Sequence, residues 1–334
     1  MKIILDAFGG DLAPLEPLKG AQQAVAELGV EILAVGDVKT MEACCKDNSI
    51  DTKNITFKQA SDVISMHDEP MDVVKKRPKS SMHVALKALA EGEGDALVSA
   101  GSTGALLMGA TFITKRIKGC KRPALASVLP CENPSGVMLI DSGANAEIRP
   151  EMLNQFGIMG SVYMEKVAGR THARVALLNN GVEASKGPQT HRDAYLLLQG
   201  NKNINFIGNI EAREILSDMT DVIVADGFSG NVALKASEGA AAFMNKQLKN
   251  MFKTSLKTKV AALLMKDQLK QFKAKLDYTE YGGSPILGVC QGVIKAHGSS
   301  NAKAFKNAIK QAKIYAENDV SNLIAAQLAP EEEI

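Results

Sequence analysis

Tryptophan is absent from the 334-residue sequence, and aromatic residues make up only 4% of it. The apolar residues, 46% of the chain, are therefore mostly aliphatic, as is typical of parallel strands buried between helices. The chain also has few cysteines, and no two of them form a C-x-x-C pair. An odd number of unpaired cysteines argues against a disulfide framework and a zinc motif, and indicates a reducing compartment. The five are Cys44, Cys45, Cys120, Cys131 and Cys290.

Long hydrophobic runs are also missing. The longest, such as 260–265, fall far short of the roughly 20 apolar residues that span a bilayer. The first eleven residues already contain acidic residues and glycines, so they do not read as a secretion signal. The net charge of +2 gives no reason to expect a nucleic-acid partner. Together these absences predict a cytoplasmic chain.

One pattern recurs along the chain: a short apolar run, a turn rich in Gly, Asn or Asp, and then a helical stretch. Such alternation predicts a mostly parallel sheet with helices on both faces, and we expect one α/β domain over 1–334. Ligands of such sheets bind beyond the carboxyl ends of the strands, so the turns are expected to form a single site. The predicted strands span 3–6, 96–99, 137–141, 174–178, 204–207 and 221–225.

The segment 244–276 breaks this pattern. It contains no Gly or Pro, and its apolar residues have helical spacing. It has nine lysines but only one acidic residue, Asp267. The spacing predicts a basic amphipathic helix or pair of helices, which suits a membrane surface or an acidic partner. The alternative is an ordinary surface helix packed on the core.

Two turns have the composition of anion sites. The turn Asp6–Asp11 has two glycines after a strand, which let the backbone approach a ligand. The turn Gly101–Gly104 places small and hydroxylated residues at the start of a helix. A plain strand-to-helix turn and a Ser or Thr helix cap are the respective alternatives.

Three further turns carry polar candidates. Lys186 follows a strand and can neutralise phosphate, although most loop lysines are simply solvated. Asn231 can donate its amide to a developing oxyanion, but its spacing favours a helix cap. His297 lies in a Gly/Ser-rich turn, and Ser300 or Asn301 is expected to cap the helix that follows it.

Taken together, the motifs resemble the bacterial acyl-acyl-carrier-protein:phosphate acyltransferases of phospholipid synthesis. Nine segments occur in the family's order, from one end of the chain to nearly the other. They are DAFGGD, SAGSTGALLMGA, KRPALA, DSGANAE, QFGIMGSVY, INFIGNIEARE, DGFSGNVALK, YGGSPILG and VIKAHGSS.

The resemblance implies a three-layer α/β/α sandwich related to phosphotransacetylases and isocitrate-type dehydrogenases. It also implies a homodimer with a protruding basic amphipathic segment, here 244–280, that contacts membranes and acidic acyl carrier protein. The enzyme would then associate peripherally with the membrane and pass acyl phosphate to a membrane glycerol-phosphate acyltransferase. No metal or cofactor is implied.

The resemblance also implies the site. Lys186 and Asn231 are the expected catalytic pair. Phosphate or substrate contacts are expected from Asp6, Gly9, Gly10, Asp11, Gly101, Ser102, Thr103, Gly104, Asn145, Asn179, Asp226 and His297. Membrane or carrier-protein contacts are expected from Leu256, Val260, Leu264, Lys266, Lys270 and Lys273.

Two residues depart from the family's pattern. Leu12 stands where the family usually has His, and Ser102 where it usually has Asn. Three other functions are therefore weighed: a short-chain phosphotransacetylase using acyl-coenzyme A, a decarboxylating dehydrogenase of the related fold, and a non-catalytic membrane adaptor for carrier protein.

Overall fold

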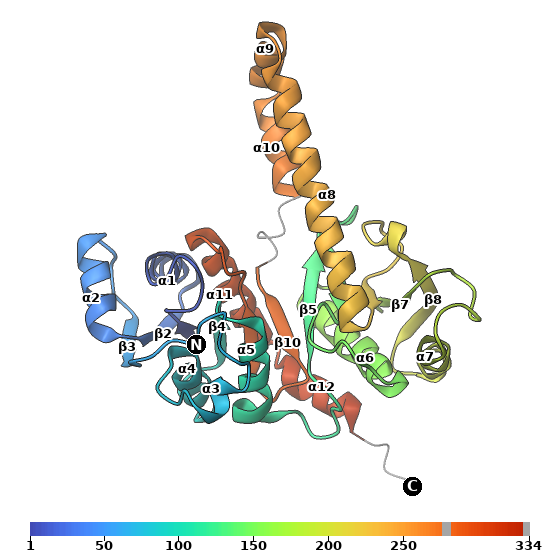
Figure 1. Ribbon diagram of the computed structural model, residues 1–334, viewed down its shortest axis with the longest axis horizontal. Coiled ribbons are helices and arrows are strands. Elements are labelled where there is room, and N and C mark those ends of the chain that lie inside the picture. The colour runs from blue at the N-terminus through green and yellow to red at the C-terminus, as the bar shows by residue number, and fades with distance from the viewer. Residues whose placement is uncertain (276–281, 330–334) are drawn as a thin grey trace.

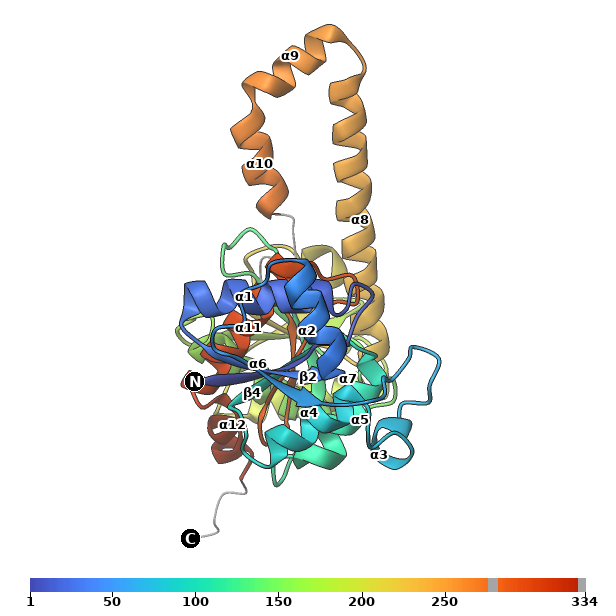
Figure 2. The same cartoon turned by 90° about the vertical axis from the view of Figure 1, so that its left-hand side faces the viewer.

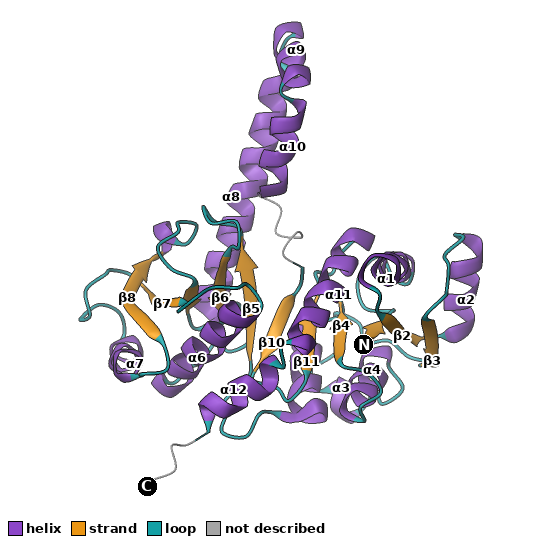
Figure 3. Cartoon of the chain, turned by 180° about the vertical axis from the view of Figure 1, so that it is seen from behind, coloured by secondary structure: helices purple, strands orange, loops and turns teal. Residues whose placement is uncertain are grey.

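A single eleven-stranded sheet forms the centre of the molecule (Figure 3). The computed structural model describes residues 1–275 and 282–329. The strands lie in the order β3-β2-β1-β4-β11-β10-β5-β6-β9-β7-β8. Their bounds are β1 Lys2–Asp6, β2 Glu31–Gly36, β3 Ile55–Gln59, β4 Ala96–Ser99, β5 Ala124–Leu129, β6 Val137–Ile140, β7 Arg174–Asn179, β8 Asn205–Glu211, β9 Val222–Val224, β10 Ser284–Leu287 and β11 Gly292–Lys295.

The sheet consists of two parallel blocks that run in opposite directions. Strands β3, β2, β1, β4 and β11 are parallel to one another, as are β6, β9, β7 and β8. The antiparallel pairings β11–β10, β10–β5 and β5–β6 join the blocks. The mostly parallel sheet is thus confirmed, and because the two blocks run in opposite directions their carboxyl ends lie at opposite edges of the sheet.

Alternate strand residues face two layers of helices, which confirms the three-layer sandwich. In β1, Ile3 and Leu5 face the first layer and Ile4 faces the second. The first layer contains α1 Leu15–Leu28, α2 Val38–Asp47, α6 Pro150–Lys166, α7 Gln189–Gly200, α11 Ala302–Glu317 and α12 Val320–Leu328. The second contains α3 Asp72–Lys75, α4 Ser81–Ala90, α5 Thr103–Gly109, the π-helix Ala110–Lys115 and the start of α8. A 3₁₀ turn, Ala212–Glu214, follows β8.

A helical projection stands away from this sandwich. Helix α8 (Gly227–Lys253) rises from the sheet, α9 (Leu256–Leu264) crosses at the tip, and α10 (Lys266–Lys275) returns (Figures 1 and 2). None of the residues between 244 and 273 whose exposure is described is buried. The alternative of a helix packed on the core is therefore wrong. The predicted segment ran to residue 280, and 276–280 lie outside the described residues.

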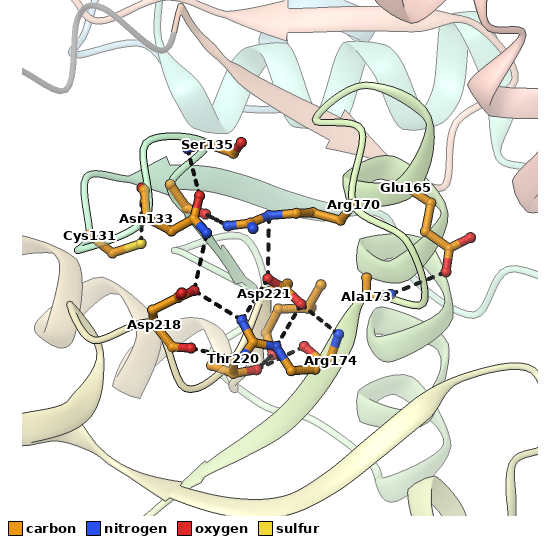
Figure 4. Close-up of polar contacts among 12 residues, drawn as sticks. Cys131, Asn133, Ser135, Glu165, Arg170, Ala173, Arg174, Asp218, Thr220 and Asp221 are labelled. Atoms are coloured by element: carbon orange, nitrogen blue, oxygen red, sulfur yellow. Dashed lines mark hydrogen bonds and ion pairs between the residues drawn. The ribbon is translucent and has the colours of Figure 1, made fainter.

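An ion-pair network fixes the amino-terminal ends of β7 and β9 (Figure 4). Both Nε and Nη2 of Arg174 donate to the Asp221 carboxylate, at 3.0 and 3.1 Å. Arg174 Nη2 also donates to Asp218 at 3.0 Å, and Arg170 Nε lies 3.3 Å from Asp221. Burial acts to raise the pKa of Asp221, but these bonds outweigh it and hold the pKa below its usual value.

Candidate functional site

A polar cavity of about 260 Å³ lies over the central strands, where the two blocks of the sheet meet. This is the switch point at which α/β sheets commonly bind ligands. Residues from both blocks line it, so the cavity lies across the face of the sheet rather than at one edge. Its polar lining consists of Thr103, Ser127, Ser142, Asn231, Lys235, Glu238, Ser284, Lys295, His297 and Ser300.

The turns after β1 and β4 lie against each other on one side of this cavity. A Cβ atom built on Gly9 would be 2.7 Å from the Gly101 nitrogen, so this contact requires glycine. Asp11 N–H donates to the Gly298 carbonyl at 2.8 Å, which ties in the turn after β11. Among the predicted residues of these turns, Thr103 and His297 line the cavity. The others, Asp6, Gly9, Gly10, Asp11, Gly101, Ser102 and Gly104, surround it without lining it.

Asp6 is buried beneath these turns. Its Oδ2 accepts the Ser99 hydroxyl at 2.7 Å, and that hydroxyl oxygen accepts Gly101 N–H at 3.1 Å. Burial raises the pKa of Asp6, although these hydrogen bonds oppose the shift. The carboxylate therefore fixes the two glycine turns from below.

The turn after β6 is organised around Asp141, which is fully buried. Its Oδ1 accepts N–H groups of Leu125, Gly143 and Ala144 at 3.2, 3.0 and 2.9 Å. Its Oδ2 accepts both the backbone N–H and the side-chain amide of Asn145, at 2.7 and 2.8 Å. These five bonds fix the segment that brings Ser142 and Gly143 into the cavity.

Asn231 lies in the first turns of α8 and lines the cavity. The expectation that it caps the helix is wrong, because Asp226 accepts the N–H groups of Phe228 and Ser229 at 3.0 and 2.8 Å. The Asn231 amide is thereby left for the cavity. Gly143 lies against Asn231, and its φ of +142° is a backbone conformation that favours glycine. The predicted residues Asn145 and Asp226 meet at the base of α8, where the Gly227 N–H donates to the Asn145 carbonyl at 2.8 Å.

Lys186 is exposed in the loop between β7 and α7 and does not line the cavity. Asn179 Nδ2 donates to the Lys186 carbonyl at 3.1 Å, so these two predicted residues share one loop. Among the predicted residues, Asn231, Thr103 and His297 therefore line one cavity, whereas Lys186 and Asn179 belong to a loop outside its lining.

Sequence reasoning missed the two lysines that do line the cavity. Lys235 lies one turn after Asn231 on α8 and pairs with Glu238 at 2.8 Å. Lys295 ends β11, and burial lowers its pKa to about 8. A lysine that directly ends an otherwise apolar strand, two residues before His297, was the available signal.

The His297 ring is oriented by its own turn. Its Nδ1 accepts the Ser299 N–H at 3.3 Å, so the neutral ring carries its proton on Nε2. Burial, and then the nearby Lys295 and Lys235, lower the pKa of His297. The ring is thus neutral at pH 7.

A second, more open cavity of about 360 Å³ adjoins the polar one. The two share Gly143, Asn231 and Lys235. Phe228 and Val232 line the second cavity and are 67% and 54% exposed, so its surface is mainly apolar. Asn231 therefore lines both the polar cavity and the apolar cavity.

The reactive groups of the described chain favour polar catalysis at this cavity over covalent thiol chemistry. Burial raises the pKa of Cys120 to about 11, and it raises the pKa of Cys44, Cys45 and Cys131 as well.

Over residues 1–275 and 282–329, no three His, Cys, Asp or Glu side chains are grouped to hold a metal ion. Within the same ranges, no helix is long and apolar enough to cross a bilayer.

Comparison with known proteins identifies the family. The family profile described as "Fatty acid synthesis protein" matches residues 1–323. The phosphate acyltransferase of Oceanobacillus iheyensis is 46% identical over 98% of this chain and 97% of its own. That of Clostridioides difficile is 42% identical over 93% and 91%. A phosphotransacetylase structure from Streptococcus pyogenes, 15% identical, matches the fold with a TM-score of 0.67 over 95% of this chain and 94% of that one. The chain therefore belongs to the phosphate acyltransferase family and is an acyltransferase.

Proposed function

We propose that this chain transfers a long-chain fatty acyl group from acyl-acyl-carrier-protein to inorganic phosphate, giving acyl phosphate for phospholipid synthesis. The observation that carries the proposal is the arrangement around Asn231. A polar cavity with a half-buried lysine, Lys295, suits phosphate, and the adjoining apolar cavity suits an acyl thioester. The family membership supports phosphate as the acceptor.

The reaction joins two substrates at the acyl carbonyl. A phosphate oxygen attacks the carbonyl carbon, the carbon–sulfur bond breaks, and the carrier's thiolate leaves, taking up a proton from solvent or phosphate. A thiol of pKa about 8.5 leaves readily as its thiolate, so alignment and charge stabilisation are the enzyme's main tasks. We assign the oxyanion of the tetrahedral intermediate to the amide of Asn231.

Lys186 is proposed as the second functional residue, on the resemblance and on its charge. It lies in an exposed loop outside the polar cavity, so we propose that it meets a phosphate or phosphopantetheine group that approaches from outside. The cavity residues and Lys186 would then act on different parts of the two substrates.

The projection supports a carrier-protein donor and a peripheral membrane position. Its lysines lie on helices whose apolar side chains are exposed, including Leu256 at 78%, Val260 at 51% and Leu264 at 80%. Such a surface attracts anionic headgroups and acidic proteins, and its apolar residues enter the lipid interface. Lys266, Lys270 and Lys273 repeat along α10. On the resemblance we also propose a cytoplasmic homodimer that supplies a membrane glycerol-phosphate acyltransferase.

The decisive experiment is acyl phosphate formation by the purified chain. Long-chain acyl-carrier-protein and acyl-coenzyme A are supplied in parallel, each with phosphate. We expect product from the carrier substrate. Product from coenzyme A alone would instead favour a phosphotransacetylase, and no product from either donor would favour the adaptor.

A further inference from the structure

Lys295 reaches the polar cavity from the centre of the sheet. It is the last residue of β11, and in the parallel register with β4 it lies opposite Ser99, the last residue of that strand. Its Nζ donates to the carbonyl of Ala100 at 3.3 Å and, at short range, to that of Ala296. Two backbone carbonyls thus fix the ammonium group beside the turn that follows β4.

The charge of this ammonium group has no close counterion. Among the described residues, no carboxylate lies within 4.0 Å of Lys295, whereas Lys235 has Glu238 at 2.8 Å. The charged and titratable groups that face Lys295 are Asp6 of β1, Asp11 of the following turn, Lys235 and Glu238 of α8, and His297.

Those neighbours do not neutralise Lys295. The negative charges of Asp11 and Asp6 favour the charged form of Lys295. Burial outweighs both and lowers the pKa of Lys295 to about 8. Burial raises the pKa of Asp6 in turn, which weakens that carboxyl as a counterion. A half-buried cation without a counterion is costly, and an anion that enters the cavity relieves the cost.

The surroundings of Lys295 provide hydrogen bonds for a small oxyanion. Thr103, Ser142, Asn231 and His297 line the same cavity. The cavity holds about 260 Å³ and shares Asn231 with the adjoining apolar cavity. An oxyanion held by Lys295 and a group in the apolar cavity would therefore both lie in cavities that Asn231 lines.

From this geometry we propose that Lys295 binds the phosphate that serves as acyl acceptor, in the cavity that shares Asn231 with the apolar cavity. The inference rests on the proposed use of phosphate as substrate. It assigns the acceptor site to the sheet centre and leaves Lys186 for the donor side.

Binding of inorganic phosphate, measured by titration calorimetry on the full chain, tests the assignment without any acyl donor. We expect Lys295→Met to weaken phosphate binding about 10- to 100-fold at pH 7, the range of one charge-assisted hydrogen bond. Lys295→Arg should retain most of the affinity because its charge remains. Lys202→Met is the matched control, since Lys202 is exposed outside the cavity, and it should bind phosphate like the wild type.

The pH dependence of the wild type is an independent readout. Phosphate is a dianion from pH 8 to 10, whereas Lys295 loses its charge above about pH 8. Affinity should therefore fall by up to about tenfold per pH unit in this range, and Lys295→Arg should remove the fall. The pH dependence of phosphate binding by the wild type tests the assignment even if Lys295→Met does not fold.

Three results would overturn the assignment. The first is a folded Lys295→Met variant that binds phosphate as tightly as the wild type. The second is a wild-type affinity for phosphate that does not change from pH 8 to 10. The third is a wild-type protein that does not bind phosphate. A parallel titration with 4′-phosphopantetheine distinguishes the two sources of phosphate, and a Lys295 effect confined to that ligand would also count against it. Failure of both acyl donors in turnover would contradict the proposed function while leaving these binding results to decide on Lys295.

Discussion

Replacing Asp141 by Asn tests how the cavity is built. The carboxylate accepts five hydrogen bonds, three on Oδ1 and two on Oδ2. An Asn side chain has one acceptor oxygen, and its amide nitrogen cannot accept. Its best orientation keeps the three bonds from Leu125, Gly143 and Ala144, and loses both bonds from Asn145.

The magnitude follows from those two bonds. Each hydrogen bond to a charged acceptor contributes about 1.5–3 kcal/mol, so the gross loss is about 3–6 kcal/mol. Part of this is recovered, because Asn avoids burying a charge, a cost that is evident in the raised pKa of Asp141. We therefore expect a net loss of about 2–4 kcal/mol, a large share of the roughly 5–15 kcal/mol that stabilises a folded protein.

Urea unfolding followed by circular dichroism measures this loss, and kcat/KM reports on the site. The turn from Ser142 to Asn145 should shift, so kcat/KM should fall about tenfold or more even at temperatures where the variant is folded. Asp193→Asn is the control, because that carboxylate accepts an exposed bond from Gln189, and its loss should stay within about 0.5 kcal/mol. An Asp141→Asn protein with wild-type unfolding and wild-type kcat/KM would refute the reasoning.

Three further predictions concern other parts of the chain. Lys186→Ala should lower turnover about 100-fold with unchanged unfolding, as measured by steady-state kinetics, if the lysine acts in the transition state. Leu256→Glu combined with Leu264→Glu should release the protein from anionic vesicles in a sedimentation assay, because both side chains are exposed on α9. Arg174→Met should cost about 2–4 kcal/mol in urea unfolding, because it leaves the Asp221 carboxylate without its main partner. The pKa of Asp221 is lowered in the fold, so this pair stabilises fully above about pH 4, and the difference from wild type should narrow in more acidic solution.

Each of these has a contrary outcome. Near-normal turnover of Lys186→Ala would remove that residue from catalysis. Unchanged vesicle binding by the double variant, with Asp267→Asn as a control that leaves the apolar residues intact, would exclude α9 as the membrane contact. An Arg174→Met variant as stable as the wild type at pH 7 would show that the network in Figure 4 contributes little.

The sequence predicted the strands with strong apolar runs. Residues 96–99 form β4 as expected, and the other five expected strands correspond to β1, β6, β7, β8 and β9. The helical spacing of 244–276 also corresponds to helices, although Ser255 starts a new helix with a capping box and so divides the segment. These features depend on local periodicity, which is visible along the chain.

The polarity of the sheet was not predictable in the same way. Strands β10 and β11 are only four residues long each, and the turn after β5 leads to β6 rather than to a helix. Their antiparallel pairings reverse the sheet, and pairing between distant segments leaves no local pattern. Lys295 was missed for this reason, because its proximity to Asn231 depends on how β11 pairs.

Asn231 shows how a local rule gives a wrong result. An Asn near a helix start commonly caps the helix, but Asp226 lies five positions earlier and has the stronger claim as an acceptor for the first N–H groups. Comparing the two residues as caps would have predicted Asp226 as the cap and left the Asn231 side chain available for another role. For α11 the sequence left Ser300 and Asn301 as candidates, and Asn301 is the cap, since its side chain accepts Ala304 N–H at 3.0 Å.

Helix α8 has a mechanical consequence. It is one uninterrupted rod of 27 residues, about 40 Å long at 1.5 Å per residue, with Asn231 near its fixed end and the lysine-rich tip at the other. If the rod pivots at its Asp226 cap, Asn231 is about 6–8 Å from the fulcrum, so a tip displacement of about 3 Å moves its amide by about 0.5 Å. Displacements of that size already alter the alignment of reacting groups. In that case a displacement of the tip of the projection also changes the position of Asn231.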